Sequence, residues 1–236
     1  MPFSSEPAPP AVLVFDLDDT LYCERDFAFS GFAAVEAHLA RLHGDAIIPG
    51  TCRALFESGR RLAIFDCALK QFGIASDPAA IADLVALYRN HSPQIAPCPD
   101  TVRLLEADPR PRAIITDGPA AMQRSKIAAL GLGDQFGLII PTGDLPLGMG
   151  KPHPRAFEQV MEWSGRPGPD HVYIADNPAK DFLAPKMLRW RTVQIDRAGR
   201  VHGGEAPSPE HAADARITSL DDLTETIRQK PRLGVV

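Results

Sequence analysis

The chain has 236 residues, of which 44% are hydrophobic, and its formal net charge is −5 at pH 7. This length and apolar content fit one large α/β domain, or a core domain that carries a smaller insertion. The acidic balance and the lack of a basic block argue against a nucleic-acid polymer as partner, and no apolar stretch approaches the roughly 20 residues of a membrane-spanning helix.

The first residues, MPFSSEPAPP, are rich in proline and serine and predict a disordered tail over 1–10. They have neither the positive region nor the apolar region of a secretory signal. The cysteines show no CxxC or zinc-type spacing, so we expect reduced thiols in a cytoplasmic protein. The four cysteines are Cys23, Cys52, Cys67 and Cys98.

The first predicted element is a strand over 11–15, AVLVF. Its continuous apolar character is typical of a parallel strand that is buried on both faces. The strand ends abruptly in DLDDT, which contains Asp16, Asp18 and Asp19. Charges of one sign this close repel, so folding them into one turn costs free energy unless another group offsets the repulsion.

Residues 22–99 contain helical patterns and no convincing strand. Helices are expected over Phe27–His43 and Thr51–Phe72, and from Asp77 to about Asn90, where Asp77-Pro78 is a good pair for a helix start. A proline-rich return, HSPQIAPCPD, follows. We therefore expect a compact helical insertion over 22–99.

The rest of the chain, 100–236, alternates short apolar runs with helical patterns. This alternation predicts a doubly wound, Rossmann-like parallel sheet, to which 11–21 contributes the first strand. The expected strands are Ala113–Thr116, Leu138–Ile140, Val172–Ala175, Thr192–Ile195 and a short one near Ile217. The expected helices begin at Pro119, Pro154, Pro178 and Asp221, with a mobile loop over 198–213.

Polar residues follow each of the first four apolar runs. In an open α/β sheet, ligands bind beyond the carboxyl ends of the strands, so these residues should meet at one edge of the sheet. The set consists of Asp16, Asp18, Thr116, Asp117, Gly118, Lys151, Asp176 and Asp181.

Four segments in order, DLDDT, ITDG, GKP and DNPAKD, resemble the motifs of the haloacid dehalogenase (HAD) superfamily of phosphohydrolases. The resemblance spans residues 11 to about 196. The helical insertion lies between the first and second motifs, where that family carries its C1 cap, so the chain resembles the C1-capped subgroup. Such a cap would exclude water and contact the leaving group.

The resemblance implies a role for each core residue. Asp16 would be the nucleophile that forms an aspartyl-phosphate, and Asp18 would be the general acid and base. Thr116, Lys151 and the main-chain N–H of Asp117 or Gly118 would hold the phosphoryl oxygens.

The resemblance also implies a Mg²⁺ cofactor, which takes oxygen ligands. Asp16, the main-chain carbonyl of Asp18, and Asp176 would bind it, and Asp181 would act directly or through water. This cation and the lysine would offset the repulsion within DLDDT. The side chain of Asp19 is expected to cap the turn or face solvent.

The presence of Asp18 favours a leaving group that needs a proton, so phosphate ester hydrolysis is favoured over dehalogenation. Substrate choice is expected to depend on the cap and its approach, with Arg25, Arg60 and Arg61 as candidates.

We therefore expect a Mg²⁺-dependent phosphatase, monomeric or homodimeric, that acts on a small phosphorylated metabolite and not at a membrane. The low aromatic content favours a sugar phosphate over a nucleoside 5′-monophosphate. A phosphotransferase or mutase on the same scaffold stays open, and a non-catalytic binding protein is the remote alternative.

Overall fold

The computed structural model describes residues 10–229. The tail predicted over 1–10 therefore lies outside the described residues, except for Pro10. The chain divides into two compact units, one formed by Arg25–Ile95 and the other by the segments before and after it.

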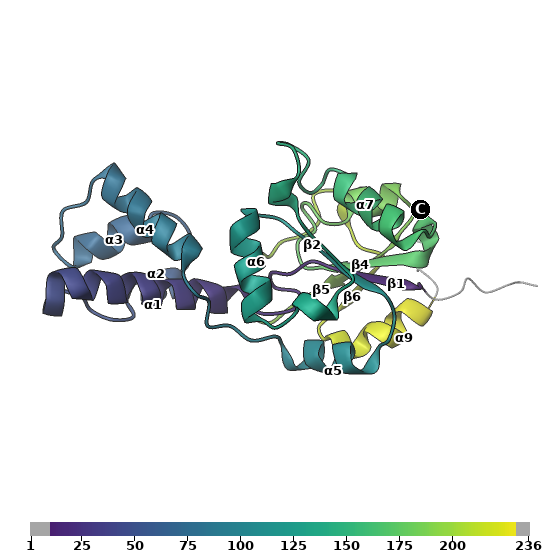
Figure 1. Cartoon of the computed structure of the whole chain (residues 1–236), viewed down its shortest axis with the longest axis horizontal. Coiled ribbons are helices and arrows are strands. Elements are labelled where there is room, and N and C mark those ends of the chain that lie inside the picture. Colours follow the sequence, from purple (N-terminus) through teal and green to yellow (C-terminus); the bar gives the residue numbers. More distant parts are fainter. Residues whose placement is uncertain (1–9, 230–236) are drawn as a thin grey trace, which may run out of the picture. The chain divides into compact units, whose positions relative to one another are not determined.

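The larger unit is built on a six-stranded sheet in which all neighbouring strands are parallel (Figure 1). The strand order is β3-β2-β1-β4-β5-β6, so the order reverses between β1 and β4. The predicted doubly wound parallel sheet is thereby confirmed. The strands are β1 (Val12–Phe15), β2 (Arg112–Thr116), β3 (Leu138–Pro141), β4 (His171–Ala175), β5 (Arg191–Ile195) and β6 (Ala215–Ile217).

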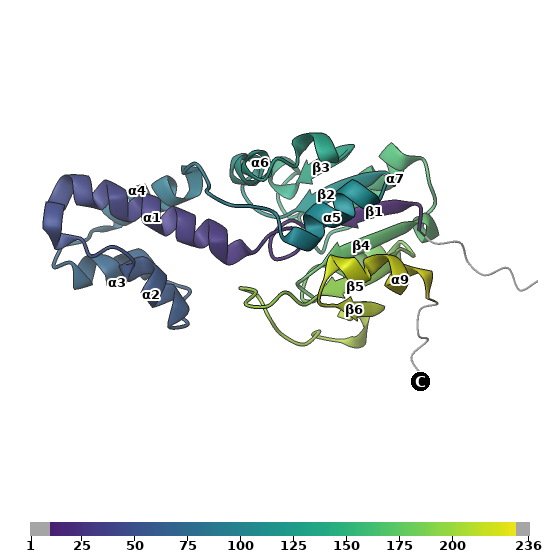
Figure 2. The same cartoon turned by 90° about the horizontal axis from the view of Figure 1, so that it is seen from below.

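Helices cover both faces of this sheet. Figures 1 and 2 show α5 and α9 over one face, with α7 over the opposite face. Val12 and Val14 of β1 belong to a buried cluster with Phe157 of α7. The helices of the larger unit are α5 (Pro99–Ala107), α6 (Ala120–Ala129), α7 (Arg155–Ser164), α8 (Leu183–Met187) and α9 (Leu223–Arg228).

The smaller unit is helical and has its own core. Phe32 stacks on Tyr88, with ring centroids 5.6 Å apart, and Phe65 packs edge-on against both rings. Gly31 permits this packing, because a Cβ there would lie 2.5 Å from the Tyr88 ring. The helices are α1 (Glu24–His43), α2 (Thr51–Glu57), α3 (Ile64–Gln71) and α4 (Pro78–Asn90).

Short 3₁₀ helices complete the secondary structure. They are η1 (Gly44–Ala46), η2 (Gly133–Gln135), η3 (Thr142–Asp144), η4 (Gly168–Asp170), η5 (Pro209–His211) and η6 (Leu220–Asp222). Among residues 10–229, no helix has both the length and the apolar character needed to cross a membrane.

Two expectations about helices were wrong. The helix predicted over Thr51–Phe72 is two helices, because Gly59 and Ala63 take left-handed backbone angles, φ +94° and +53°. The helix predicted from Pro178 is the short α8, since the Asp181 carboxylate accepts a hydrogen bond from the Asn177 N–H (3.0 Å) and holds residues 177–181 as a turn. The expected C-terminal helix from Asp221 is present, with its first turn formed by the 3₁₀ helix η6 and the rest by α9.

One helix, α5, was not predicted. It begins inside the proline-rich return, where Pro99 occupies the first helical turn. Proline is well suited to that position, because the first N–H groups of a helix have no partner within it.

Candidate active site

Three buried carboxylates meet where β1 and β4 end. Asp16 directly follows β1, and its N–H donates to the Ile174 carbonyl of β4 (2.9 Å). Asp176 directly follows β4, and Asp181 closes the turn after it. One carboxylate oxygen from each of Asp16, Asp176 and Asp181 lies within 4.8 Å of the others. The group therefore forms at the reversal of strand order, the place where such sheets bind ligands.

Lys151 supplies the positive charge beside these carboxylates. Its Nζ lies 2.7 Å from Asp16 Oδ1 and 2.7 Å from Asp181 Oδ1, and it donates to the Tyr173 hydroxyl (3.0 Å). Burial works against a charge on this fully buried amine, but Asp16 and Asp181 outweigh it and raise the pKa of Lys151 well above its usual value. Lys151 is therefore a fixed cation.

Lys151, together with Lys180, which also acts to lower the pKa of Asp16, does not neutralise three carboxylates. Burial raises the pKa of Asp16 to about 6, even though Lys151 acts in the opposite direction. Burial, Asp16 and Asp181 together raise the pKa of Asp176 to about 9. A divalent cation would remove this repulsion. Buried carboxylate oxygens without cysteine or histidine are the donor set of a hard cation, so the group fits Mg²⁺.

The Asp18 carboxylate belongs to a different set of contacts, and its pKa moves the other way. Lys126 Nζ lies 2.7 Å from Asp18 Oδ1, the Gln123 amide donates to Oδ2 (2.9 Å), and the Tyr22 hydroxyl donates to Oδ1. Burial alone would raise the pKa of Asp18, but Lys126, Tyr22 and Gln123 together lower it. Two aspartates of one motif thus have opposite environments.

Sequence reasoning missed Lys126 and Gln123. Both side chains are buried, and their spacing of three residues places them on one face of α6. Gln123 also donates to the Thr116 hydroxyl (2.5 Å), so it connects the first and second motifs. The available signal was a glutamine and a lysine one helical turn apart, in the helix that begins right after ITDG.

The second and third motifs lie close together. Thr116 ends β2 and is buried. The Asp117 carboxylate accepts hydrogen bonds from the Thr142 hydroxyl (2.6 Å) and the Lys151 N–H (3.2 Å). Gly143 allows η3 to pack closely against the second motif, because a Cβ at this position would lie 2.4 Å from the Gly118 carbonyl. The side chain of Asp117 therefore positions the loop that carries Lys151.

Asp19 is buried, so the expectation that it faces solvent was wrong. The alternative expectation, that its side chain caps the turn, agrees with its contacts. Its carboxylate accepts hydrogen bonds from the N–H of Glu24, the first residue of α1 (2.9 Å), and of Val201 (2.6 Å). Its φ is +49°, a left-handed angle that aspartate tolerates better than most residues. The loop expected over 198–213 is thus tied to the first motif at Val201.

The three candidate specificity residues belong to the smaller unit, whereas the carboxylates and Lys151 belong to the larger one. Arg25 lies 3.9 Å from Asp26, and both side chains are exposed. Arg61 donates to the Phe56 carbonyl (2.6 Å), and its guanidinium lies 4.1 Å from the centre of the Phe56 ring. Arg60 is exposed.

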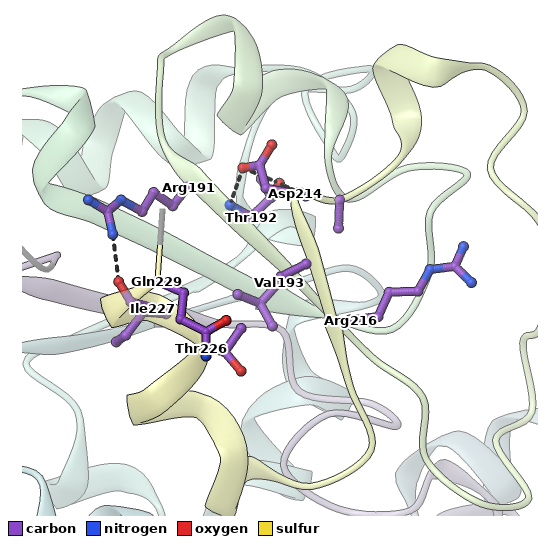
Figure 3. Close-up of a pocket in the computed structure, with 10 residues that line it drawn as sticks. Arg191, Thr192, Val193, Asp214, Arg216, Thr226, Ile227 and Gln229 are labelled. Atoms are coloured by element: carbon purple, nitrogen blue, oxygen red, sulfur yellow. Dashed lines mark hydrogen bonds between the residues drawn. The ribbon is translucent and has the colours of Figure 1, made fainter. Parts of the chain in front are cut away.

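A separate pocket lies between β5, β6 and α9 (Figure 3). Its volume is about 500 Å³, and two hydrogen bonds join residues of its lining. Arg191 donates to the Ile227 carbonyl (2.6 Å), and Asp214 accepts from the Thr192 N–H (2.9 Å). Its lining includes no member of the carboxylate–lysine set, so this pocket is separate from the candidate active site.

Comparison with known proteins agrees with this geometry. Residues 10–188 match the model of the haloacid dehalogenase-like hydrolase family. A phosphoserine phosphatase from Thermus thermophilus is 31% identical over 111 residues, which is 47% of this chain and 42% of that protein. A glyceraldehyde 3-phosphate phosphatase from Methanocaldococcus jannaschii is 26% identical over 225 residues, 92% of this chain and 96% of that protein. The magnesium-bound structure of the putative HAD-hydrolase YfnB from Bacillus subtilis has a TM-score of 0.67 at 19% identity, covering 93% of this chain and 99% of that one.

Proposed function

The chain belongs to the haloacid dehalogenase-like hydrolases, and from that premise we propose that it is a Mg²⁺-dependent phosphatase of small phosphorylated metabolites. The observation that carries the proposal is that two aspartates of one motif have different surroundings. Asp16 lies among buried carboxylates 2.7 Å from Lys151, while Asp18 is held apart by Lys126 and Gln123. A nucleophile and an acid–base group need such different environments.

Asp16 would act as the nucleophile. One of its carboxylate oxygens forms a bond to phosphorus as the bond between phosphorus and the ester oxygen breaks. Water then attacks the same phosphorus, and the phosphate leaves with the Asp16 carboxylate restored. Its pKa of about 6 leaves most of Asp16 ionised at neutral pH.

Asp18 would carry the proton in both steps. It gives a proton to the leaving ester oxygen, and as a carboxylate it then takes one from the attacking water. Lys126 and the Tyr22 hydroxyl favour the ionised form, which is the product of the first step and the base of the second.

The remaining core residues would hold the phosphoryl group and its counter-charge. Lys151, the Thr116 hydroxyl and the main-chain N–H of Asp117 or Gly118 would bind the phosphoryl oxygens. Asp16, Asp176, Asp181 and the main-chain carbonyl of Asp18 would bind Mg²⁺, which supplies positive charge for the phosphoryl oxygens.

A short sugar phosphate is the substrate class that we favour. The support is the match to a glyceraldehyde 3-phosphate phosphatase over 92% of this chain and 96% of that protein. The phosphoserine phosphatase match supports phosphate esters in general, because it spans less than half of either chain. We further propose that the smaller unit acts as a C1 cap, in which Arg25, Arg60 and Arg61 influence which ester is accepted.

A phosphate-release screen tests this function. Purified protein is assayed against triose and hexose phosphates, phosphoserine, nucleoside monophosphates and p-nitrophenyl phosphate, with Mg²⁺ or with a chelator. We expect phosphate release without any added acceptor, with chelation abolishing it and Mg²⁺ restoring it. Release only when a sugar acceptor is present would indicate a phosphotransferase, and release that survives exhaustive chelation would contradict the metal assignment.

A further inference from the structure

Two cysteines that are 75 residues apart in the sequence meet in the larger unit. The Sγ atoms of Cys23 and Cys98 lie 3.9 Å apart, and both side chains are half-buried. Sequence spacing indicated no pairing among the four cysteines, because the pairing depends on how the chain returns to the sheet after the insertion.

These cysteines lie beside the two points where the chain passes between the units. Cys23 directly precedes Glu24, the last residue before the smaller unit, and Cys98 comes two positions after Ala96, the first residue after it. The two passing segments are bonded to each other. The Leu21 carbonyl accepts hydrogen bonds from the Cys98 N–H (3.0 Å) and from the Thr101 hydroxyl (2.8 Å). The two thiols are therefore held near each other by the backbone.

We propose that Cys23 and Cys98 form a reversible disulfide that joins the two passing segments and lowers turnover at the active site. A disulfide needs its sulfur atoms about 2.0 Å apart, so the two Sγ atoms must approach by roughly 2 Å. The 3.9 Å contact shows that the side chains already point toward each other. In a reducing compartment such a bond responds to oxidant and is not a permanent crosslink.

The oxidant class is a small disulfide such as oxidised glutathione. The Cys23 thiolate attacks one glutathione sulfur, which forms a mixed disulfide and releases one glutathione thiolate. The Cys98 thiolate then attacks the Cys23 sulfur and releases the second glutathione. Two protein thiols are oxidised and one glutathione disulfide is reduced to two thiols. The contact with Cys23 and burial raise the pKa of the Cys98 thiol, which disfavours Cys98 as the first attacking group.

The effect on turnover rests on the proposed phosphatase function. Tyr22 holds Asp18, and the Glu24 N–H is held by Asp19, so the residues on both sides of Cys23 contact the first motif. Pulling Cys23 toward Cys98 would displace these contacts. A displacement of about 1 Å near a reacting group can cost on the order of tenfold to a hundredfold in rate.

The test uses the full chain in a series of reduced and oxidised glutathione. Intact mass, counting of alkylated thiols and phosphate release are measured on the same samples. We expect the wild type to lose two of its four thiols together, with a mass about 2 Da lower, and to lose turnover about tenfold or more, all reversed by dithiothreitol.

Two kinds of variant complete the test, one that keeps the proposed disulfide and one that removes it. Cys67→Ser, a half-buried cysteine of the smaller unit, should behave as the wild type does, whereas Cys23→Ser and Cys98→Ser should form no internal disulfide and keep their turnover. Four free thiols in the wild type at every glutathione ratio, or a 2 Da loss (about two hydrogens) that persists in Cys23→Ser, would overturn the site. Full crosslinking with unchanged turnover would overturn the regulatory effect. Formation of the disulfide is measured by mass, which does not depend on activity, so its absence is distinguishable from a failure of the phosphatase proposal.

Discussion

Asp16 and Asp18 are two residues apart, yet their carboxylates have opposite surroundings. The pKa of Asp16 is raised to about 6 by burial, and that of Asp18 is lowered by Lys126 and its neighbours despite burial. Their positions after β1 explain the difference. Asp16 directly follows β1, whereas Asp18 lies in the next turn, which faces α6. At the residue scale, the partner on α6 decides what the second aspartate can do.

Lys126→Met tests this partner. Removing the ammonium should raise the pKa of Asp18. Because ionised Asp18 is needed to activate water, the acid limb of the profile of kcat against pH should move to higher pH. We expect kcat on p-nitrophenyl phosphate to fall about tenfold or more at pH 6 and to recover partly toward pH 8. The measurement is kcat against pH, with Lys70→Met on the exposed surface as control. An unshifted profile would show that Lys126 does not tune Asp18.

Replacing Lys151 should have a general effect, unlike replacing a residue of the smaller unit. Lys151→Met should lower kcat on every ester by about 10²–10³-fold, because charge on the phosphoryl oxygens matters most in the transition state. Arg60→Ala and Arg61→Ala should instead change the ranking of substrates and spare p-nitrophenyl phosphate. The measurement is kcat/KM over a panel of esters. A uniform loss in the arginine variants, or no loss, would assign those arginines to the surface or to local structure.

Residues at strand ends could be located from the sequence, and residues that reach them from helices could not. Asp16, Thr116 and Asp176 each end an apolar run or directly follow one, so a parallel sheet brings them to one edge. Lys126 and Gln123 required knowing which face of α6 turns toward β1, and that depends on packing rather than on spacing.

At the scale of elements, a buried ion pair connects segments that are far apart in the sequence. Arg197, after β5, donates to the Thr20 carbonyl (2.6 Å) and to Asp100 of α5 (2.7 Å). Asp100 also accepts from the N–H of Leu220 (2.7 Å) and the hydroxyl of Ser219 (3.1 Å), which begin η6. This pair therefore holds the first motif, α5 and the C-terminal helices in one arrangement.

Arg197→Met should destabilise the larger unit. Its removal leaves the buried Asp100 charge without its partner, which costs about 3–5 kcal/mol in the free energy of unfolding. Burial acts to raise the pKa of Asp100, but Arg197 and the other hydrogen bonds to Asp100 outweigh it and lower this pKa. The stabilisation is therefore present above the unfolded pKa of about 3.9 and is lost as the pH falls through the lower folded value. Urea unfolding at pH 7 and pH 3 measures both effects.

The control for that experiment is Arg103→Met, whose ion pair with Asp221 is exposed and should contribute little. Equal losses in the two variants would mean that burial of the Arg197–Asp100 pair does not matter.

Helix limits were the weakest part of the sequence-based prediction, for local reasons. Gly59 and Ala63 separate α2 from α3 through left-handed angles that the apolar pattern does not reveal. The helix α5 was hidden by prolines that interrupt a helix when internal but begin one when first. Strand positions agreed more closely, because a strand buried on both faces has a continuous apolar sequence.

At the scale of the whole molecule, the proposed cation site should control stability as well as activity. Without a cation, the raised pKa values of Asp16 and Asp176 mean that the folded protein binds protons more tightly than the unfolded chain. The fold should therefore lose stability as the pH rises from about 4 toward 9. Mg²⁺ should remove this loss, because it binds the folded state.

Chemical unfolding at pH 5 and pH 8, with chelator or Mg²⁺, measures that effect. Asp176→Asn is the matched variant: it should be more stable than the wild type at pH 8 in chelator, and Mg²⁺ should stabilise it much less. Equal stabilisation of the wild type and Asp176→Asn by Mg²⁺ would place the cation elsewhere.

The central claim is that Asp16 is the nucleophile of a phosphatase, and one comparison tests it most directly. The rate of phosphate release in saturating Mg²⁺ is measured for the wild type and for Asp16→Asn, with circular dichroism to verify that the variant is folded. The account predicts that the wild type releases phosphate from small esters and that the folded variant releases it only at the background rate. Substantial turnover by folded Asp16→Asn would contradict it.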